Sequence, residues 1–176
     1  MKYALILFVG LLLVSCGTKV PFTEAVRDEF GLDNEAALVK VQFFTSATII
    51  FERNKESGNQ GTTSGGVLVQ NSNKEQDRII IAIGTKCVFE SLSDEGVVVR
   101  FEPGVGNTIS FGMRPGQSSG KYYLLADWTQ KEGGKLVYGN NDYFATTSSG
   151  TAYLQVVRKK LQKTKRKDRV VKGMKV

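Results

Sequence analysis

The stretch Gln42-Phe43-Phe44-Thr45-Ser46-Ala47-Thr48-Ile49-Ile50-Phe51-Glu52 decides the fold, because apolar and polar side chains alternate along it with a period of two. Phe43, Thr45, Ala47, Ile49 and Phe51 fall on one face of a strand, and Gln42, Ser46, Thr48 and Glu52 fall mostly on the other. The pattern predicts a β-strand with one face in the core.

Further strand candidates follow at the even spacing that is typical of an all-β domain. Short connections rich in Gly, Asn and Asp separate them, and short connections join antiparallel neighbours because parallel strands need long crossovers. The apolar run 78–83 predicts a strand that is buried on both faces. The fold class we predict is mainly β: a single antiparallel β-sandwich or small barrel. The other predicted strands are 62–70, 87–92, 97–102, 108–113, 122–128, 135–138, 143–147 and 151–157, with a loop over 54–61 and a turn over 71–74.

One or two short helices are expected before the strands. Thr23 can cap a helix that runs through Phe30, and Gly31 can end it in the left-handed conformation. Asp33 is the expected cap of a second short helix, from residue 34 to about 40.

Near the N-terminus one basic residue, Lys2, is followed by an uninterrupted apolar run of 12 residues, 3–14. A membrane-spanning helix needs roughly 20 apolar residues, so this run is too short to cross a bilayer. A basic start, a short apolar segment and a small residue at its end are typical of a secretory signal peptide. Residues 1–15 are therefore predicted to be a signal peptide and to contribute nothing to the fold.

Leu13-Val14-Ser15-Cys16, at the end of this run, resembles the lipobox of bacterial lipoproteins position by position. The resemblance implies that the Cys16 thiol receives a diacylglyceryl group, that cleavage occurs just before Cys16, and that the new amino terminus is acylated too. Residues 16–22 would then be a lipidated spacer. Because Gly17 stands where aspartate would favour retention at the inner membrane, the resemblance implies an outer-membrane, periplasm-facing lipoprotein of the cell envelope.

The chain contains no histidine and two cysteines, one of which is Cys16. Histidine-dependent nucleophilic catalysis and histidine-containing zinc sites are therefore excluded. Cys87 lies in an apolar context, where a free cysteine usually packs as a small hydrophobe. We predict no metal site and no cofactor, and an enzyme is the less favoured class.

Two further motifs each have a structural interpretation beside the functional one. Gly104-Val105-Gly106 lacks the third glycine and the following helix of a nucleotide-binding loop, so it predicts a hairpin loop. Glu90, Asp94, Glu95 and Glu102 are the densest acidic residues. They could supply calcium oxygens or a glycosidase-like carboxylate pair, and solvated strand ends are the default interpretation.

The C-terminal third is rich in aromatic residues. Exposed rings can stack on sugar faces or anchor a protein interface, although rings on one face of a sheet more often form the core. The neighbours Tyr122 and Tyr123 must point to opposite faces of any strand, so one of them is a candidate for exposure. With Trp128 they are the predicted glycan or partner contacts.

The net charge of +7 comes from the end of the chain. Residues 158–176 hold ten basic residues and one acidic residue, a net charge of +9, whereas 17–157 carries −3. We therefore divide the mature chain into a helix-plus-β domain, 23–157, and a polybasic tail, 158–176. Anionic lipid or acidic cell wall is the expected partner of the tail, and export argues against nucleic acid. The tail residues expected to act electrostatically are Lys163, Lys165, Arg166, Lys167 and Arg169.

Two functions from different classes remain open. The favoured one is a membrane-anchored envelope lipoprotein that acts without catalysis, as a binding or assembly component for a partner protein or a cell-wall glycan. The alternative is a carboxylate-dependent hydrolase of envelope glycans, which needs a pair of acids about 5 to 10 Å apart in a cleft.

Overall fold

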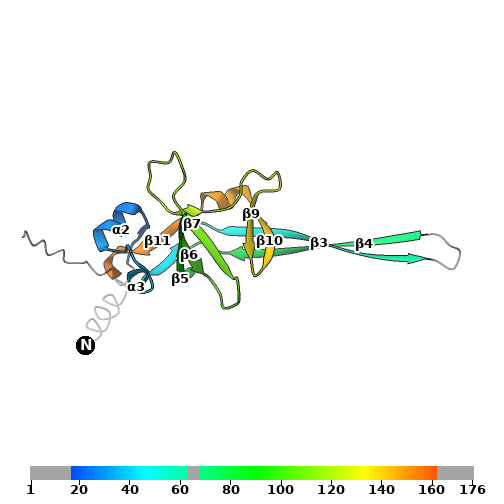
Figure 1. The fold of residues 1–176 in the computed structure, drawn as a ribbon, viewed down its shortest axis with the longest axis horizontal. Helices are drawn as coiled ribbons and strands as arrows, with labels where there is room; N and C mark the ends of the chain where they lie inside the picture. Colours follow the sequence, from blue (N-terminus) through cyan, green and yellow to red (C-terminus); the bar gives the residue numbers. More distant parts are fainter. Residues whose placement is uncertain (1–16, 63–67, 162–176) are drawn as a thin grey trace, which may run out of the picture.

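The computed structural model describes the backbone of residues 17–62 and 68–161, and side chains over 17–54 and 76–161. Within these ranges the chain forms two antiparallel sheets, two short α-helices and short 3₁₀ segments (Figure 1). The elements are β1 (Lys19–Pro21), α2 (Glu24–Phe30), α3 (Glu35–Leu38), β2 (Gln42–Thr45), β3 (Ile49–Thr62), β4 (Leu68–Ile81), β5 (Lys86–Ser93), β6 (Gly96–Arg100), β7 (Thr108–Gly112), β8 (Tyr123–Leu124), β9 (Gly134–Tyr138), β10 (Asn141–Ala145), η2 (Thr147–Thr151), β11 (Leu154–Val157) and η3 (Arg158–Lys160).

The mainly β prediction is confirmed. One sheet has the strand order β1-β11-β2-β5-β6-β7-β8 and the other has the order β4-β3-β10-β9. The two sheets are consistent with a β-sandwich and do not close into a barrel. The large sheet curls so that β8 approaches the start of β11. Leu124 on β8 donates its amide to the carbonyl of Ala152, just before β11.

The stretch 42–52 forms two strands in different sheets. β2 pairs with β11 and β5 in the large sheet, whereas β3 pairs with β4 and β10 in the small one. The predicted face is buried at both ends of the stretch: Phe43, Thr45, Ile49 and Phe51 are fully buried. A single strand was the wrong interpretation, because the chain changes sheet at residues 46–48 without losing the alternation.

The predicted loop 54–61 and turn 71–74 are wrong, because both lie in the long β3–β4 hairpin. Its register runs without interruption from Ile49 opposite Ile81 to Thr62 opposite Leu68. The predicted strand 62–70 is wrong too, since β3 ends at Thr62, β4 begins at Leu68, and 63–67 lie outside the described residues. The sequence of these two strands is polar and contains several glycine and asparagine residues, so it resembles a loop. The part of the hairpin that pairs with no third strand, residues 53–62 and 68–77, is called the arm below, and it projects from one end of the body (Figure 1).

The run 78–83 is not buried on both faces. Ile81 is buried, but Ile80 and Ile83 are exposed by 57% and 67%. β4 is the edge strand of the small sheet, and only one of its faces meets the core.

The helices begin almost where the sequence predicts. The Thr23 hydroxyl accepts the Val26 amide at 3.2 Å, and Gly31 ends α2 with φ of 62°. The second cap is Asn34 rather than Asp33, because the Asn34 side chain accepts the Ala37 amide at 2.9 Å.

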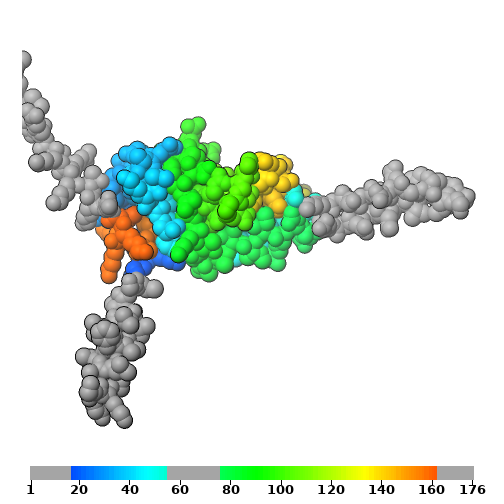
Figure 2. Space-filling view, turned by 90° about the horizontal axis from the view of Figure 1, so that it is seen from below, coloured from blue at the N-terminus to red at the C-terminus, as the bar shows by residue number. Residues whose placement is uncertain are grey.

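Both ends of the described chain belong to the folded body. Lys19–Pro21, expected to be part of a spacer, form β1 instead and pair with β11, and Phe22 is fully buried. At the other end Arg158 forms an ion pair with Glu29 at 2.6 Å, and Leu161 packs against the core. Figure 2 shows these blue and orange residues together at the end of the body opposite the arm.

Candidate functional site

A hollow of about 590 Å³ lies where the segments after β7 and after β8 meet η2. Its volume is within the range of roughly 300 to 1,000 Å³ found for small-molecule sites. We call it the aromatic hollow. It is lined by Arg114, Gln117, Tyr123, Trp128, Gln130, Lys131, Gly133, Thr147, Gly150, Thr151 and Tyr153.

Arg114 joins three of the segments that line this hollow. It follows β7, and its Nη2 donates to the carbonyl of Leu124 at 3.0 Å and to the carbonyl of Gly150 at 2.7 Å. The guanidinium carbon lies 5.1 Å from the ring centre of Tyr123 and 5.7 Å from that of Trp128. Hydrogen bonds and cation–π contacts therefore hold the charge in one place.

Trp128 is fixed by two glycines. A Cβ at Gly134 would lie 2.8 Å from the indole ring, and a Cβ at Gly150 would lie 3.1 Å from it. Any larger residue at Gly134 would push the ring out of its place. The indole N–H is buried and has no hydrogen-bond acceptor among the described residues. Leaving such a donor unpaired costs about 1–3 kcal/mol.

Tyr123 is the member of the tyrosine pair that reaches the aromatic hollow. Its ring meets that of Tyr153 edge to face at 5.7 Å, and Lys121 Nζ lies 4.7 Å from the centre of the Tyr153 ring. Tyr122 points the other way, is 2% exposed and packs against Phe22. Of the three predicted contacts, the structure thus brings Tyr123 and Trp128 together and places Tyr122 in the core.

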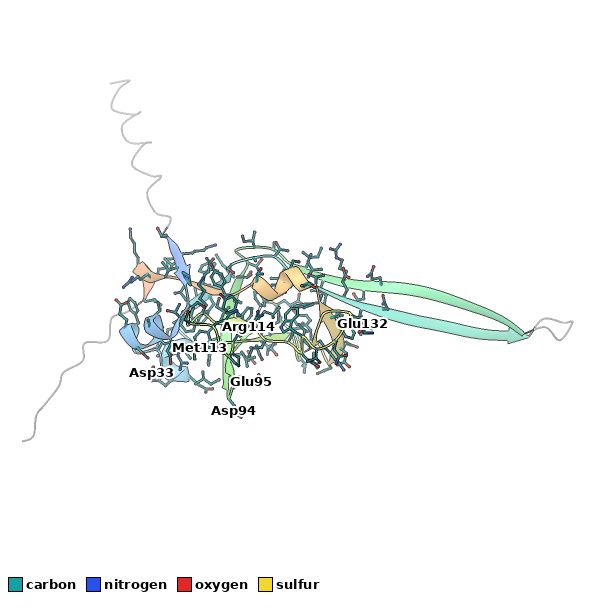
Figure 3. All side chains as sticks on the ribbon, turned by 90° about the horizontal axis from the view of Figure 1, so that it is seen from above. Asp33, Asp94, Glu95, Met113, Arg114 and Glu132 are labelled. Atoms are coloured by element: carbon teal, nitrogen blue, oxygen red, sulfur yellow. The ribbon has the colours of Figure 1, made fainter. Side chains whose placement is uncertain are left out.

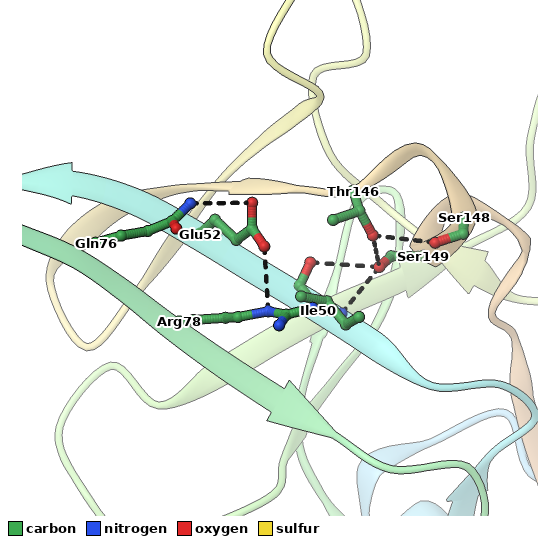
Figure 4. Close-up of polar contacts among 7 residues, drawn as sticks. All are labelled: Ile50, Glu52, Gln76, Arg78, Thr146, Ser148 and Ser149. Atoms are coloured by element: carbon green, nitrogen blue, oxygen red, sulfur yellow. Dashed lines mark hydrogen bonds and ion pairs between the residues drawn. The ribbon is translucent and has the colours of Figure 1, made fainter.

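The 3₁₀ segment η2 is tied to the small sheet by one buried serine (Figure 4). Ser149 Oγ accepts the Ile50 amide at 2.9 Å and lies 2.8 Å from the Thr146 hydroxyl. Because Thr147, Gly150 and Thr151 surround Ser149 in η2 and line the aromatic hollow, this contact fixes one wall of the site.

A second hollow, of about 490 Å³, has acidic walls that include Glu52, Glu132 and Asp142. Glu52 forms an ion pair with Arg78 at 3.1 Å and accepts the Gln76 amide at 3.4 Å (Figure 4). Asp142 forms an ion pair with Lys135 at 2.9 Å. Two of the three carboxylates are thus already paired with cations.

The acidic residues singled out in the sequence are placed on and after the β5–β6 hairpin. Glu90 on β5 accepts two hydrogen bonds from Arg100, at 2.9 and 2.6 Å, and these bonds lower the pKa of Glu90. Asp94 and Glu95 are at the turn between β5 and β6 (Figure 3), and neither lines the aromatic hollow. Glu102 accepts the hydroxyl of Tyr138 at 2.7 Å.

Cys87 is buried, as predicted, and burial raises the pKa of its thiol. The predicted loop at Gly104-Val105-Gly106 is confirmed, since it connects β6 to β7. No group of three Cys, Asp or Glu side chains that could hold a metal ion exists within the described ranges.

Cys16 and the tail residues Lys163, Lys165, Arg166, Lys167 and Arg169 lie outside the described residues. Sequence reasoning missed Arg114, because Arg114-Pro115-Gly116 reads as a turn. Its role depends on two carbonyls that are 10 and 36 residues away in the chain. Tyr153 was identified only as one of several aromatic residues, and no local signal pairs it with Tyr123.

Among the described helices, none has the length and apolar character needed to cross a bilayer. The chain matches no family model, and neither a curated protein nor a solved structure is significantly similar to it.

Proposed function

We propose that this protein is a lipid-anchored envelope lipoprotein that binds a cell-wall glycan in the aromatic hollow, without catalysis. The observation that carries the proposal is the meeting of Tyr123, Trp128 and Tyr153 at the hollow. Flat rings offer apolar faces to sugar rings, and a few polar groups then fix orientation. Gln117, Gln130, Thr147 and Thr151 supply those groups.

Binding is favoured over hydrolysis by the state of the carboxylates. A glycosidase needs one carboxylic acid that keeps its proton near neutral pH, next to a second carboxylate. Glu52 and Asp142 are in ion pairs, and Arg100 holds Glu90 in its ionised form. The lining of the aromatic hollow itself contains no carboxylate.

The placement of the termini supports an anchored orientation. Lys19, the first residue of β1, is three positions after Cys16. A diacylated Cys16 would hold the domain close to the bilayer surface. The chain leaves the body at residue 161 at the same end, so the basic tail would meet the same membrane and add an electrostatic attraction to its anionic lipids. The arm would then point away from the membrane.

Co-sedimentation with purified cell-wall sacculi tests the proposal. The full-length protein in a polyoxyethylene detergent should pellet with sacculi in a saturable way, and Tyr123→Ala should pellet far less. Val137→Ala is the matched control, because Val137 is 60% exposed on β9 and does not line the hollow. Equal pelleting of the Tyr123 and Val137 variants would exclude the aromatic hollow as the glycan site.

A further inference from the structure

The aromatic hollow has an unequal distribution of charge. Arg114 and Lys131 are in its lining, Lys121 stands over the Tyr153 ring at its edge, and no Asp or Glu lines it. The sequence over 17–157 has more acidic than basic residues, so the lining of the hollow differs in sign from the net charge of that span.

The acids nearest in sequence to the lining have hydrogen-bond or hollow partners other than Arg114 and Lys131. The carboxylate of Asp127 accepts the amide and hydroxyl of Thr129, at 3.0 and 2.6 Å, and the amide of Gln130 at 3.1 Å. Glu132 lines the acidic hollow instead, and Figure 3 shows it near the base of the arm while Arg114 lies nearer the middle of the body. Neither acid therefore neutralises Arg114 and Lys131 by a direct ion pair among the described contacts.

Arg114 has N–H groups that make no hydrogen bond among the described residues. Its two bonds to backbone carbonyls both come from Nη2, and the N–H groups on Nε and Nη1 have no acceptor among the described residues. A guanidinium is always charged and never accepts, so its free N–H groups can donate to ligand oxygens, and its charge favours an anionic one. The rings of Tyr123 and Trp128 hold it beside the surface on which a sugar would stack.

We propose that the ligand of the aromatic hollow is an acidic saccharide, whose carboxylate accepts hydrogen bonds from Arg114 and meets the charge of Lys131. This inference rests on the proposed glycan binding and specifies its ligand class. A neutral glycan would leave the free donors of Arg114 without a charged partner, and an acidic peptide would leave the three aromatic rings without a stacking sugar.

Trp128 is the only tryptophan in the chain, so its fluorescence reports on this site alone. The full-length protein in a polyoxyethylene detergent is titrated with a tetrasaccharide of alternating N-acetylglucosamine and N-acetylmuramic acid with free lactyl carboxylates. The same tetrasaccharide with its carboxylates converted to methyl amides is the matched ligand. The acidic form should bind at least about tenfold more tightly, which corresponds to one charge-assisted hydrogen bond.

Variants connect this preference to the two cations. Arg114→Gln should lower the affinity for the acidic form about tenfold and leave the amide form unchanged. Because Arg114 also holds Leu124 and Gly150, Lys131→Gln serves as a variant that keeps those bonds, and it should reduce the preference for the acidic form in the same direction. Lys86→Gln removes an exposed charge outside the hollow and should change nothing.

Equal binding of the acidic and amide forms would overturn the acidic-saccharide inference and leave glycan binding standing. No binding of either form would overturn both. A preference for the acidic form that survives Lys131→Gln and Arg114→Gln would place the anion site elsewhere and contradict the inference. Binding of an acidic peptide of equal charge with equal affinity would also contradict it.

Discussion

Replacing Ser149 by Ala should destabilise the protein more than any neighbouring polar change in η2. Ser149 is fully buried, and its hydroxyl accepts the Ile50 amide at 2.9 Å. The same hydroxyl lies 3.3 Å from the Ile50 carbonyl and 2.8 Å from Thr146 Oγ1. The alanine would leave the Ile50 amide without its acceptor. β10 cannot supply another, because its pairing with β3 ends at Ala145 opposite Phe51.

The expected loss follows from the cost of an unsatisfied buried donor. Removing one partner of a buried hydrogen bond costs about 1–3 kcal/mol, and the small change in side-chain volume adds little. With a urea slope of about 2 kcal/mol per molar, a loss of about 2 kcal/mol moves the unfolding midpoint by about 1 M. The assay is urea unfolding of the chain from residue 17 onward, followed by far-ultraviolet circular dichroism.

Ser148→Ala is the matched control. Ser148 is exposed in the same turn, and its hydroxyl contacts only Thr146 Oγ1, at 3.1 Å, among the described residues. Surface changes of this kind are usually within about 0.5 kcal/mol of neutral. If the two variants unfold at the same urea concentration, Ser149 does not fix η2 to β3. The claim that this contact fixes one wall of the aromatic hollow would then be wrong.

Three further predictions concern the core, the anchor and the tail. Burial and the hydrogen bond to Glu102 raise the pKa of Tyr138, so the unfolded chain loses the hydroxyl proton before the folded protein does as the pH rises above about 10. The free energy of unfolding should therefore fall in that range, and it should fall less steeply in Tyr138→Phe. Urea unfolding between pH 9 and pH 11 measures both. Replacing Cys16 by Ser should abolish incorporation of a fatty-acid analogue, and undiminished label would contradict the lipoprotein proposal. Deleting residues 162–176 keeps Leu161 on the core and should leave folding intact. The deletion should weaken binding to anionic vesicles at low salt, because the Debye length is about 30 Å at 0.01 M. Equal vesicle binding by the truncated and full-length proteins would show that the tail makes no electrostatic contribution.

The sequence predicts the parts of the fold that local chemistry dictates. Alternation places Phe43, Ile49 and Phe51 in the core, and the last strand alternates as expected, with Ala152, Leu154 and Val156 fully buried. Thr23 and Gly31 act as predicted because a cap involves only the neighbouring turn. These features need no knowledge of distant residues.

The missed features depend on contacts between distant segments. Alternation continues through residues 46–48, so it does not reveal that β2 and β3 belong to different sheets. The arm has the polar composition of a loop, although its two strands pair in continuous register. Arg114 acquires its place from Leu124 and Gly150, and Tyr153 meets Tyr123 across a gap of 30 residues in the chain. The aromatic hollow is therefore a product of topology, and its composition could be suspected from the sequence only through Tyr123 and Trp128.

The most direct test of the central claim is a proton–nitrogen correlation spectrum of the protein, recorded while soluble glycan strands released from the cell wall are added. The indole N–H of Trp128 gives one isolated signal, because the chain has a single tryptophan. If glycan binds in the aromatic hollow, this signal and the amides of Gly150 and Thr151 shift together and saturate, and Tyr123→Ala abolishes the shifts. Shifts confined to the arm or to the end of the body near the termini, or no shifts at saturating glycan, would contradict the claim.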